Sequence, residues 1–162
     1  MHSASDMLAH SLTNSRFMIH RFTDDLKSDE FLHRPTPQAN CAAWLVGHLA
    51  LADRRLLTLL GAGDLPSLPA GFEKQFSRDE GCPQAGEFGD VSTLLPIFDQ
   101  HRDRLIAAVK NAPPDQLSKL VEKPMPMAKT LGEWVNFMSL HTAMHAGQIT
   151  IIRRSLGKPP LI

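Results

Sequence analysis

Apolar residues recur at three- and four-residue steps in four long segments of the chain. In the first segment the apolar positions are Leu8, Leu12, Ile19, Phe22 and Leu26. Steps of this size place side chains on one face of an α-helix, which completes a turn about every 3.6 residues. We expect this first helix to end before Pro35 and Pro37, because each proline denies its predecessor the helical conformation and lacks a backbone N–H.

A second helix is predicted over the segment CAAWLVGHLALADRRLLTLL, which is rich in Ala and Leu. Asn40 is a suitable N-cap for it, and Gly61 and Gly63 mark its end. From Gly61 to Asp90 the chain contains six glycines and three prolines and shows no hydrophobic period. Such a composition indicates a long crossover connection.

The third predicted helix has its apolar positions at Leu94, Phe98, Leu105 and Val109. It follows Asp90 and ends before Pro113. Because Pro96 conflicts with a regular start at Val91, we expect the helix to begin near Leu95, with Pro96 in the first turn, where a missing N–H costs nothing. The alternative is a separate or bent turn ahead of the helix.

The last helix is predicted from a capping box in which Thr130 precedes Glu133 by three residues, and Gly157 and Pro159 end it. Four helices, one long connection in the middle and no alternating strand pattern favour an all-α fold. The specific prediction is a four-helix bundle with a long crossover between helices two and three. A length of 162 residues suits a single domain over residues 1–162.

Charge argues against two classes of partner. Lys plus Arg and Asp plus Glu both number 17, and no block of like charge occurs, so we expect neither nucleic acid nor an anionic membrane as a partner. The N-terminus lacks a basic region followed by an apolar one, and no stretch approaches the roughly 20 apolar residues of a membrane span. We therefore expect a cytoplasmic protein.

Two cysteines, Cys41 and Cys82, are too few for a disulfide-stabilised scaffold, so both are expected to be free thiols. Cys41 precedes His48 by seven residues and could share a helical face with it. A small buried apolar residue is the commoner role of such a cysteine, and we favour that role here.

Three histidines are candidate ligands of a metal ion. His141 and His145 are four residues apart in the last helix, so both imidazoles project from one face with Cβ atoms about 5–6 Å apart. His48 lies inside the apolar segment WLVGHLA, where a polar group without a partner is costly, and Gly47 beside it would permit a close helix approach. A histidine pair at this spacing is by itself more often exposed, or hydrogen-bonded in a core, than bound to a metal ion.

Two known metal-binding motifs do not fit these histidines. The segment HTAMH lacks the Glu that a zinc peptidase needs after the first His. The di-iron motif Glu-x-x-His is needed on two helices, but it occurs once, from Glu30 to His33, in a predicted loop beside Pro35. We reject both interpretations.

Two segments of the chain, FLHRPTPQANCAAWLVGHLALADRRLL and TLGEWVNFMSLHTAMHAGQITIIRRSLGKPP, resemble the DinB/YfiT-like family of metal-binding proteins. The resemblance implies that His48 in the second helix and the pair His141 and His145 in the fourth bind one divalent metal ion. Some members of the wider superfamily use low-molecular-weight thiols such as bacillithiol or mycothiol in S-transfer or isomerisation, so membership does not fix the reaction. The resemblance also implies a homodimer.

Three neutral imidazoles leave the charge of an ion uncompensated and at least one coordination position open, as in catalytic zinc sites. We hypothesise that a thiol or water is activated there and attacks an electrophilic small molecule, which describes a thiol-dependent S-transferase or a hydrolase. Nitrogen ligands suit Zn, Ni, Fe or Cu, with Zn or Ni favoured. The alternatives are a non-catalytic metal or small-molecule binder and a bundle whose histidines form only hydrogen bonds.

Other residues near the three histidines have two interpretations each. Gln148 shares the stripe of His141 and His145, and would either orient a ligand or form an interhelical hydrogen bond. Trp44 and Trp134 would wall a cavity or fill the core, and we favour the core. The remaining histidines are interpreted as non-ligands; they are His2, His10, His20, His33 and His101.

Overall fold

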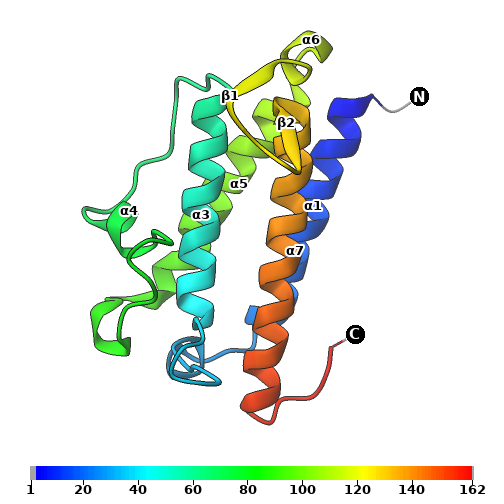
Figure 1. Cartoon of the computed structure of the whole chain (residues 1–162). Coiled ribbons are helices and arrows are strands. Elements are labelled where there is room, and N and C mark those ends of the chain that lie inside the picture. Colours follow the sequence, from blue (N-terminus) through cyan, green and yellow to red (C-terminus); the bar gives the residue numbers. More distant parts are fainter. Residues whose placement is uncertain (1–2, 162) are drawn as a thin grey trace.

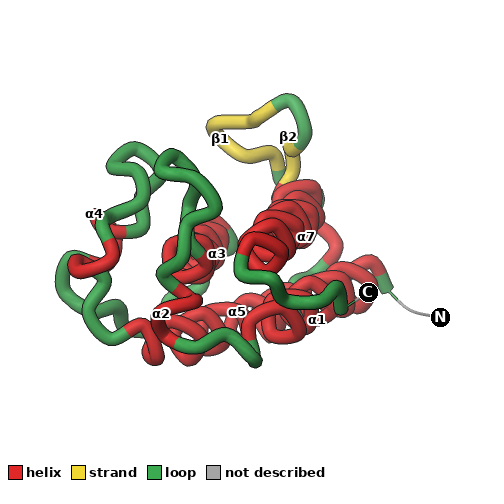
Figure 2. Tube along the Cα trace, turned by 90° about the horizontal axis from the view of Figure 1, so that it is seen from below, coloured by secondary structure: helices red, strands yellow, loops and turns green. Residues whose placement is uncertain are grey.

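Four long helices lie side by side in the computed structural model, which describes residues 3–161 (Figure 1, Figure 2). They are α1 (Ala4–Thr23), α3 (Ala42–Leu59), α5 (Leu94–Lys110) and α7 (Leu131–Ser155). The shorter elements are α2 (Ser28–Phe31), α4 (Phe72–Gln75), the 3₁₀ turns η1 (Ala85–Glu87) and η2 (Val91–Thr93), α6 (Pro114–Leu117), β1 (Leu120–Met125) and β2 (Ala128–Thr130). Within the described part of the chain, every helix is too short or too polar to cross a membrane.

The course of the chain explains the long connection between α3 and α5. In Figure 1, α1 and α7 run in one direction and α3 and α5 in the other, and Figure 2 shows the same helices from below. The long helices α3 and α5 follow each other along the chain, lie side by side and run the same way. The segment between them must therefore return along the whole length of α3, about 27 Å for 18 residues. Residues 60–93 supply this path and include α4. The structure confirms a mostly helical fold, and we call residues 60–93 the crossover connection.

Local capping chemistry sets the ends of the helices. Thr130 Oγ1 accepts a hydrogen bond from the Glu133 N–H at 3.2 Å, and the Glu133 carboxylate accepts one from the Thr130 N–H at 3.0 Å, which confirms the predicted capping box. Asn40, in contrast, is not the N-cap of α3. Cys41 takes this position, because its carbonyl accepts the first helical hydrogen bond, from the Leu45 N–H. α3 ends ahead of Gly61, whose φ of 70° is the left-handed conformation that favours glycine.

The start of α5 combines the two predicted alternatives. α5 begins at Leu94, one residue earlier than expected, with Pro96 in its first turn, and the separate turn η2 precedes it. Asp90 caps η2 by accepting a hydrogen bond from the Ser92 N–H at 3.0 Å. In the first turn Pro96 displaces no helical hydrogen bond, so the proline is tolerated.

A two-stranded hairpin departs from the predicted all-α fold. β1 and β2 pair antiparallel, with Leu120 opposite Thr130 and Met125 opposite Ala128. Most side chains of β1 are exposed, so they need not alternate between core and solvent, and the period-two signal of a strand is missing from the sequence. The pairing is made by backbone groups, which a hydrophobic pattern does not report.

A layer of buried polar groups divides the apolar core into two clusters. Arg102 on α5 is fully buried, and each of its five N–H groups has an acceptor at 2.7 to 3.2 Å. The acceptors are both carboxylate oxygens of Asp53, the hydroxyls of Ser15 and Thr142, and the carbonyl of Leu12. All four long helices contribute to this layer, which we call the Arg102 layer.

Candidate metal centre

Three histidine side chains from two helices meet between α3 and α7. His48 lies in the middle of α3, and His141 and His145 lie one turn apart on α7. The ring centroids are separated by 5.3 Å for His48 and His141, 5.4 Å for His48 and His145, and 4.4 Å for His141 and His145. One nitrogen of each imidazole lies within 4.8 Å of the other two, so these three side chains, the histidine group below, could hold one metal ion.

Hydrogen bonds through Nδ1 orient two of the imidazoles. His48 Nδ1 donates to the backbone carbonyl of Phe76 at 3.1 Å, and His145 Nδ1 donates to Gln148 Oε1 at 2.8 Å. Because each acceptor is an oxygen without a proton, Nδ1 carries the hydrogen and Nε2 presents its lone pair. His141 Nε2 lies 2.9 Å from His145 Nε2, and His141 Nδ1 is buried without a hydrogen-bond partner among residues 3–161. A hydrogen on His141 Nε2 can be donated only to His145 Nε2. A cation, in contrast, can bind one nitrogen lone pair from each of the three rings.

Aromatic rings hold the imidazoles from the sides. The Trp44 indole stacks on His48 with ring centroids 4.7 Å apart and planes inclined by 7°, and the Phe137 ring stacks on His141 at 5.8 Å and 15°. Trp44 is buried, as predicted for a core residue, but it also lines the cavity next to the histidine group, as does Trp134. The predicted core role of the tryptophans is therefore incomplete, because on this side the core also forms the cavity wall.

Burial favours the neutral form of all three imidazoles. It lowers the pKa of His48 and of His145, and it lowers the pKa of His141 to about 3, where repulsion from His145 and His48 adds to the effect. The positive charges of Arg55 and Arg78 contribute to the lowered pKa of His48. Neutral imidazole is the form that binds metal ions, so the group is in its ligand form at neutral pH.

Gly47 permits a close approach, but to a different part of the chain from the one predicted. A Cβ atom at Gly47 would lie 2.3 Å from the ring of Phe76, which follows α4 in the crossover connection. The sequence suggests contact between two helices, whereas the structure shows contact between a helix and the connection. This contact brings the Phe76 carbonyl to His48.

The histidine group lines a cavity of about 800 Å³, a volume typical of small-molecule sites. Its walls are mainly apolar, formed by Trp44, Ala52, Leu56, Leu59, Met125, Trp134, Phe137, Met138 and Met144. Arg55, Arg78 and Asp79 add charged side chains to the lining. Among residues 3–161 neither of these two arginines forms an ion pair.

Sequence reasoning misses the contribution of the crossover connection to this site. Phe76 and Arg78 lie in a segment rich in Gly and Pro without a hydrophobic period, so no pattern connects them to His48. Phe137 is also missed, although it precedes His141 by four residues and helical spacing could have identified the contact.

The other described histidines lie apart from the histidine group, and His2 lies outside the described residues. Each has a hydrogen-bond partner elsewhere: His10 with Asn14, His20 with Asp99, His33 with Ser155, and His101 with the Ile97 carbonyl. His101 is buried and its Nε2 has no partner within residues 3–161, but it does not reach the other three rings.

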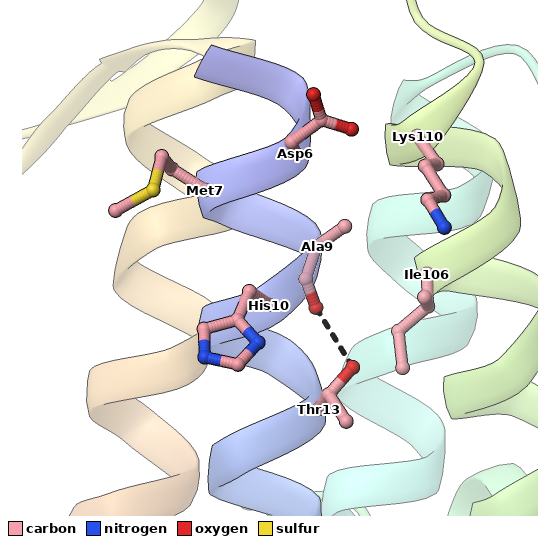
Figure 3. Close-up of a pocket in the computed structure, with 7 residues that line it drawn as sticks. All are labelled: Asp6, Met7, Ala9, His10, Thr13, Ile106 and Lys110. Carbon is pink, nitrogen blue, oxygen red and sulfur yellow. Dashed lines mark hydrogen bonds between the residues drawn. The ribbon is translucent and has the colours of Figure 1, made fainter. Parts of the chain in front are cut away.

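A second cavity, of about 380 Å³, lies between α1 and α5 and is shown in Figure 3. The Thr13 hydroxyl donates to the Ala9 carbonyl at 3.0 Å. His10 forms a hydrogen bond with Asn14 at 3.2 Å. These polar groups are used locally and do not converge on one point, so this cavity lacks the arrangement of a specific binding site.

Comparison with known proteins supports a family assignment. The family model described as DinB superfamily matches residues 11–149, a range that includes His48, His141 and His145. No protein with a curated description matches the chain. Because the family match covers well over half of the chain, this protein belongs to the DinB superfamily.

Proposed function

We propose that this protein binds one divalent metal ion through His48, His141 and His145 and uses it to activate a thiol or a water molecule for attack on a small molecule. One observation carries the proposal: three neutral imidazoles, with one nitrogen of each within 4.8 Å of the other two, line a cavity of about 800 Å³. The proposed reaction classes are thiol-dependent S-transfer and hydrolysis.

The residues present fit such an ion. An all-nitrogen donor set suits Zn or Ni, and also Fe or Cu. The Phe76 carbonyl and the Gln148 amide each hold a ligand ring through Nδ1, and such outer contacts commonly fix ring orientation in metal sites. We therefore assign Gln148 a positioning role toward His145.

A divalent ion with three neutral ligands lowers the pKa of a coordinated water to about 7 and deprotonates a coordinated thiol, so no carboxylate base is required. The chain provides the surroundings for this chemistry. Trp44 and Phe137 stack on two of the imidazoles, and most of the cavity wall beside the histidine group is apolar. Electrostatic interactions are stronger in such an environment than in water.

The cavity lining favours a substrate with an apolar body and an anionic group. Arg55 and Arg78 line the same cavity as the histidine group, and their charges act on His48. Asp79 offsets one of the two positive charges, which leaves one in excess. A guanidinium group without an ion-pair partner offers paired hydrogen bonds to a carboxylate or phosphate.

Metal analysis of tag-free protein tests ion binding. Elemental mass spectrometry is expected to find close to one ion per chain in the wild type and none in His48→Ala or His145→Ala. His10→Ala is the matched control and should keep the ion, because His10 is exposed and contacts Asn14 instead. A wild-type protein that stays metal-free after incubation with Zn²⁺ and Ni²⁺ contradicts the proposal.

Reactivity is tested separately on the metal-loaded protein. Low-molecular-weight thiols with chlorodinitrobenzene probe S-transfer, and nitrophenyl esters probe hydrolysis. Turnover that needs the ion and disappears in His48→Ala supports an enzyme. Full metal occupancy without turnover in either assay favours the alternative, a non-catalytic metal or small-molecule binder.

The charge preference of the cavity is tested with anilinonaphthalene sulfonate, a dye with an apolar body and one anionic group. Replacing both Arg55 and Arg78 by Gln is expected to weaken its binding about tenfold, the effect of losing one charge-assisted hydrogen bond. Arg21→Gln, an exposed arginine of α1, is the control. Equal dye affinity in the double variant and the control argues against an anionic substrate.

A further inference from the structure

The two cysteines lie together although they are 41 positions apart in the sequence. Cys41 Sγ is 3.7 Å from Cys82 Sγ. Cys41, the N-cap of α3, is fully buried, whereas Cys82, in the crossover connection, is partly exposed. Disulfide sulfurs lie about 2.05 Å apart, so a small rearrangement of the side chains would join them.

We propose that Cys41 and Cys82 form a redox-active dithiol, which closes to an intramolecular disulfide on reaction with a hydroperoxide and so fastens the crossover connection to α3. Both thiols are free in the structure, in agreement with the sequence-based expectation. The sequence does not indicate that they are neighbours, because the connection between them has no periodic structure.

The surroundings assign a different role to each sulfur. Cys82 is the sulfur that an oxidant reaches, and an Arg34 guanidinium nitrogen donates to the Cys82 carbonyl at 2.7 Å and to the Pro83 carbonyl. A hydrogen bond with Cys41 and the charge of Arg34 lower the pKa of Cys82 to about 6, while the same hydrogen bond and burial raise the pKa of Cys41. Cys82 therefore supplies the thiolate nucleophile, and Cys41 is the protonated thiol that resolves the intermediate.

The reaction proceeds in two balanced steps. In the first, the Cys82 thiolate attacks one oxygen of hydrogen peroxide and the O–O bond breaks. The other oxygen leaves as hydroxide, which takes a proton from solvent and becomes water. Cys82 is now a sulfenic acid. In the second step the Cys41 sulfur attacks the Cys82 sulfur, the S–S bond forms, and the S–O bond breaks as the hydroxyl departs with the Cys41 proton as water. Two thiols are oxidised and one peroxide is reduced to two water molecules.

The disulfide would act on the segment that orients His48. Phe76, whose carbonyl accepts the His48 Nδ1 hydrogen bond, precedes Cys82 by six residues, and the intervening residues 77–79 line the cavity. Cys41, the N-cap of α3, precedes His48 by seven residues, about two helical turns. Joining Cys41 to Cys82 therefore ties down both partners of the contact between Phe76 and His48 through short stretches of chain.

Thiol counting and peptide mapping on the full-length protein test the proposal. After reduction, equimolar hydrogen peroxide at neutral pH is expected to consume both free thiols and to link the Cys41 and Cys82 peptides within one chain. Cys41→Ser should stop at a Cys82 sulfenic acid that dimedone traps, whereas Cys82→Ser should react at least about tenfold more slowly. Chiefly intermolecular links, or two surviving thiols, would overturn the proposal.

Hydrogen exchange tests the effect on the connection. Amides of residues 72–82 are expected to exchange about tenfold more slowly in the oxidised than in the reduced wild type, because local opening is restricted. Cys82→Ser, treated with the same peroxide, should show no change. Equal rates in the two wild-type states would overturn the fastening. Both measurements can be made on metal-free protein, so their outcome is independent of the proposed metal site.

Discussion

Two buried polar regions lie side by side in this protein and differ in how their hydrogen-bonding groups are satisfied. In the Arg102 layer every guanidinium N–H has an acceptor, and both carboxylate oxygens of Asp53 have a donor. In the histidine group the acceptor nitrogens outnumber the available hydrogens, and the rings line a cavity. One turn of α7 serves both regions, since Thr142 belongs to the first and its neighbour His141 to the second.

The comparison shows that burial of polar groups does not by itself mark a functional site. A saturated network, in which every donor has an acceptor, has no group left to bind a ligand, and it links the four long helices to one another, which is a structural role. A buried group of acceptor nitrogens that lack donors and lie beside a cavity can bind an ion or a ligand from outside the chain. The two regions should therefore respond differently to substitution: the first through stability, the second through ion binding.

The largest expected effect comes from breaking the saturated region. Asp53→Asn leaves the fully buried Arg102 without its counter-charge, which should lower the free energy of unfolding by about 3–5 kcal/mol. Urea unfolding followed by circular dichroism measures the loss. Asp64→Asn, at an exposed position, is the control and should stay within about 0.5 kcal/mol of the wild type. A loss below about 1 kcal/mol for Asp53→Asn would show that the ion pair does not hold the helices.

Gly47→Ala tests the contact between α3 and the crossover connection, and it should affect both stability and ion binding. The new methyl group would overlap the Phe76 ring, so we expect a loss of about 1–3 kcal/mol together with weaker ion binding, because the Phe76 carbonyl must move from His48. The matched control is Gly147→Ala on α7, where a Cβ atom meets nothing within 4 Å. There the better helix propensity of Ala should stabilise the protein by up to about 1 kcal/mol. Equal effects at both positions would contradict the close approach at Gly47.

Gln148→Ala affects the second region alone. Gln148 is exposed, so its removal should leave the stability of ion-free protein nearly unchanged. Without the acceptor for His145 Nδ1, ion affinity should fall about 10- to 100-fold, measured by competition with a chromophoric chelator. Gln148→Glu keeps an acceptor at the same place and should retain most of the affinity. Unchanged affinity in Gln148→Ala would remove the proposed positioning role.

The helices could be predicted from the sequence because their signals are local. Leu12, Ile19 and Phe22 are buried at the helical spacing that their apolar character indicates, and the capping box of α7 lies within four residues. The hairpin gives no such signal, since β1 is mostly exposed. The Arg102 layer also escapes prediction, because an arginine among the charged residues of HRDR resembles a solvent-facing position.

In the candidate site too, residues related by local spacing could be predicted from the sequence, and residues brought together by long-range folding could not. His141 and His145 are related by helical spacing, whereas only its apolar surroundings and the family resemblance indicate His48 as their partner. The structure places the three together. Phe76, Arg78 and the neighbourhood of Cys41 and Cys82 depend on how an aperiodic connection folds back on α3, and no pattern in the sequence encodes that path.

The smallest expected effect is the response of the metal-free protein to acid. Burial and the neighbouring imidazoles lower the pKa of His141 to about 3, and burial lowers the pKa of His48 and His145 in the same direction, whereas an unfolded histidine has a pKa of about 6.5. Between these values the unfolded chain binds protons that the folded chain does not. This contribution to stability is therefore complete above about pH 6.5 and is lost as the pH falls toward about 3. The measurement is the urea midpoint of chelator-treated protein at about pH 7 and about pH 5. The midpoint should decrease less in His141→Gln than in the wild type, because glutamine has no proton to bind. In the control His10→Gln it should decrease as much as in the wild type. The same slope in the wild type and in His141→Gln would mean that the pKa of His141 is not lowered, and the contrast between a saturated and an unsaturated buried region would then lose its electrostatic basis.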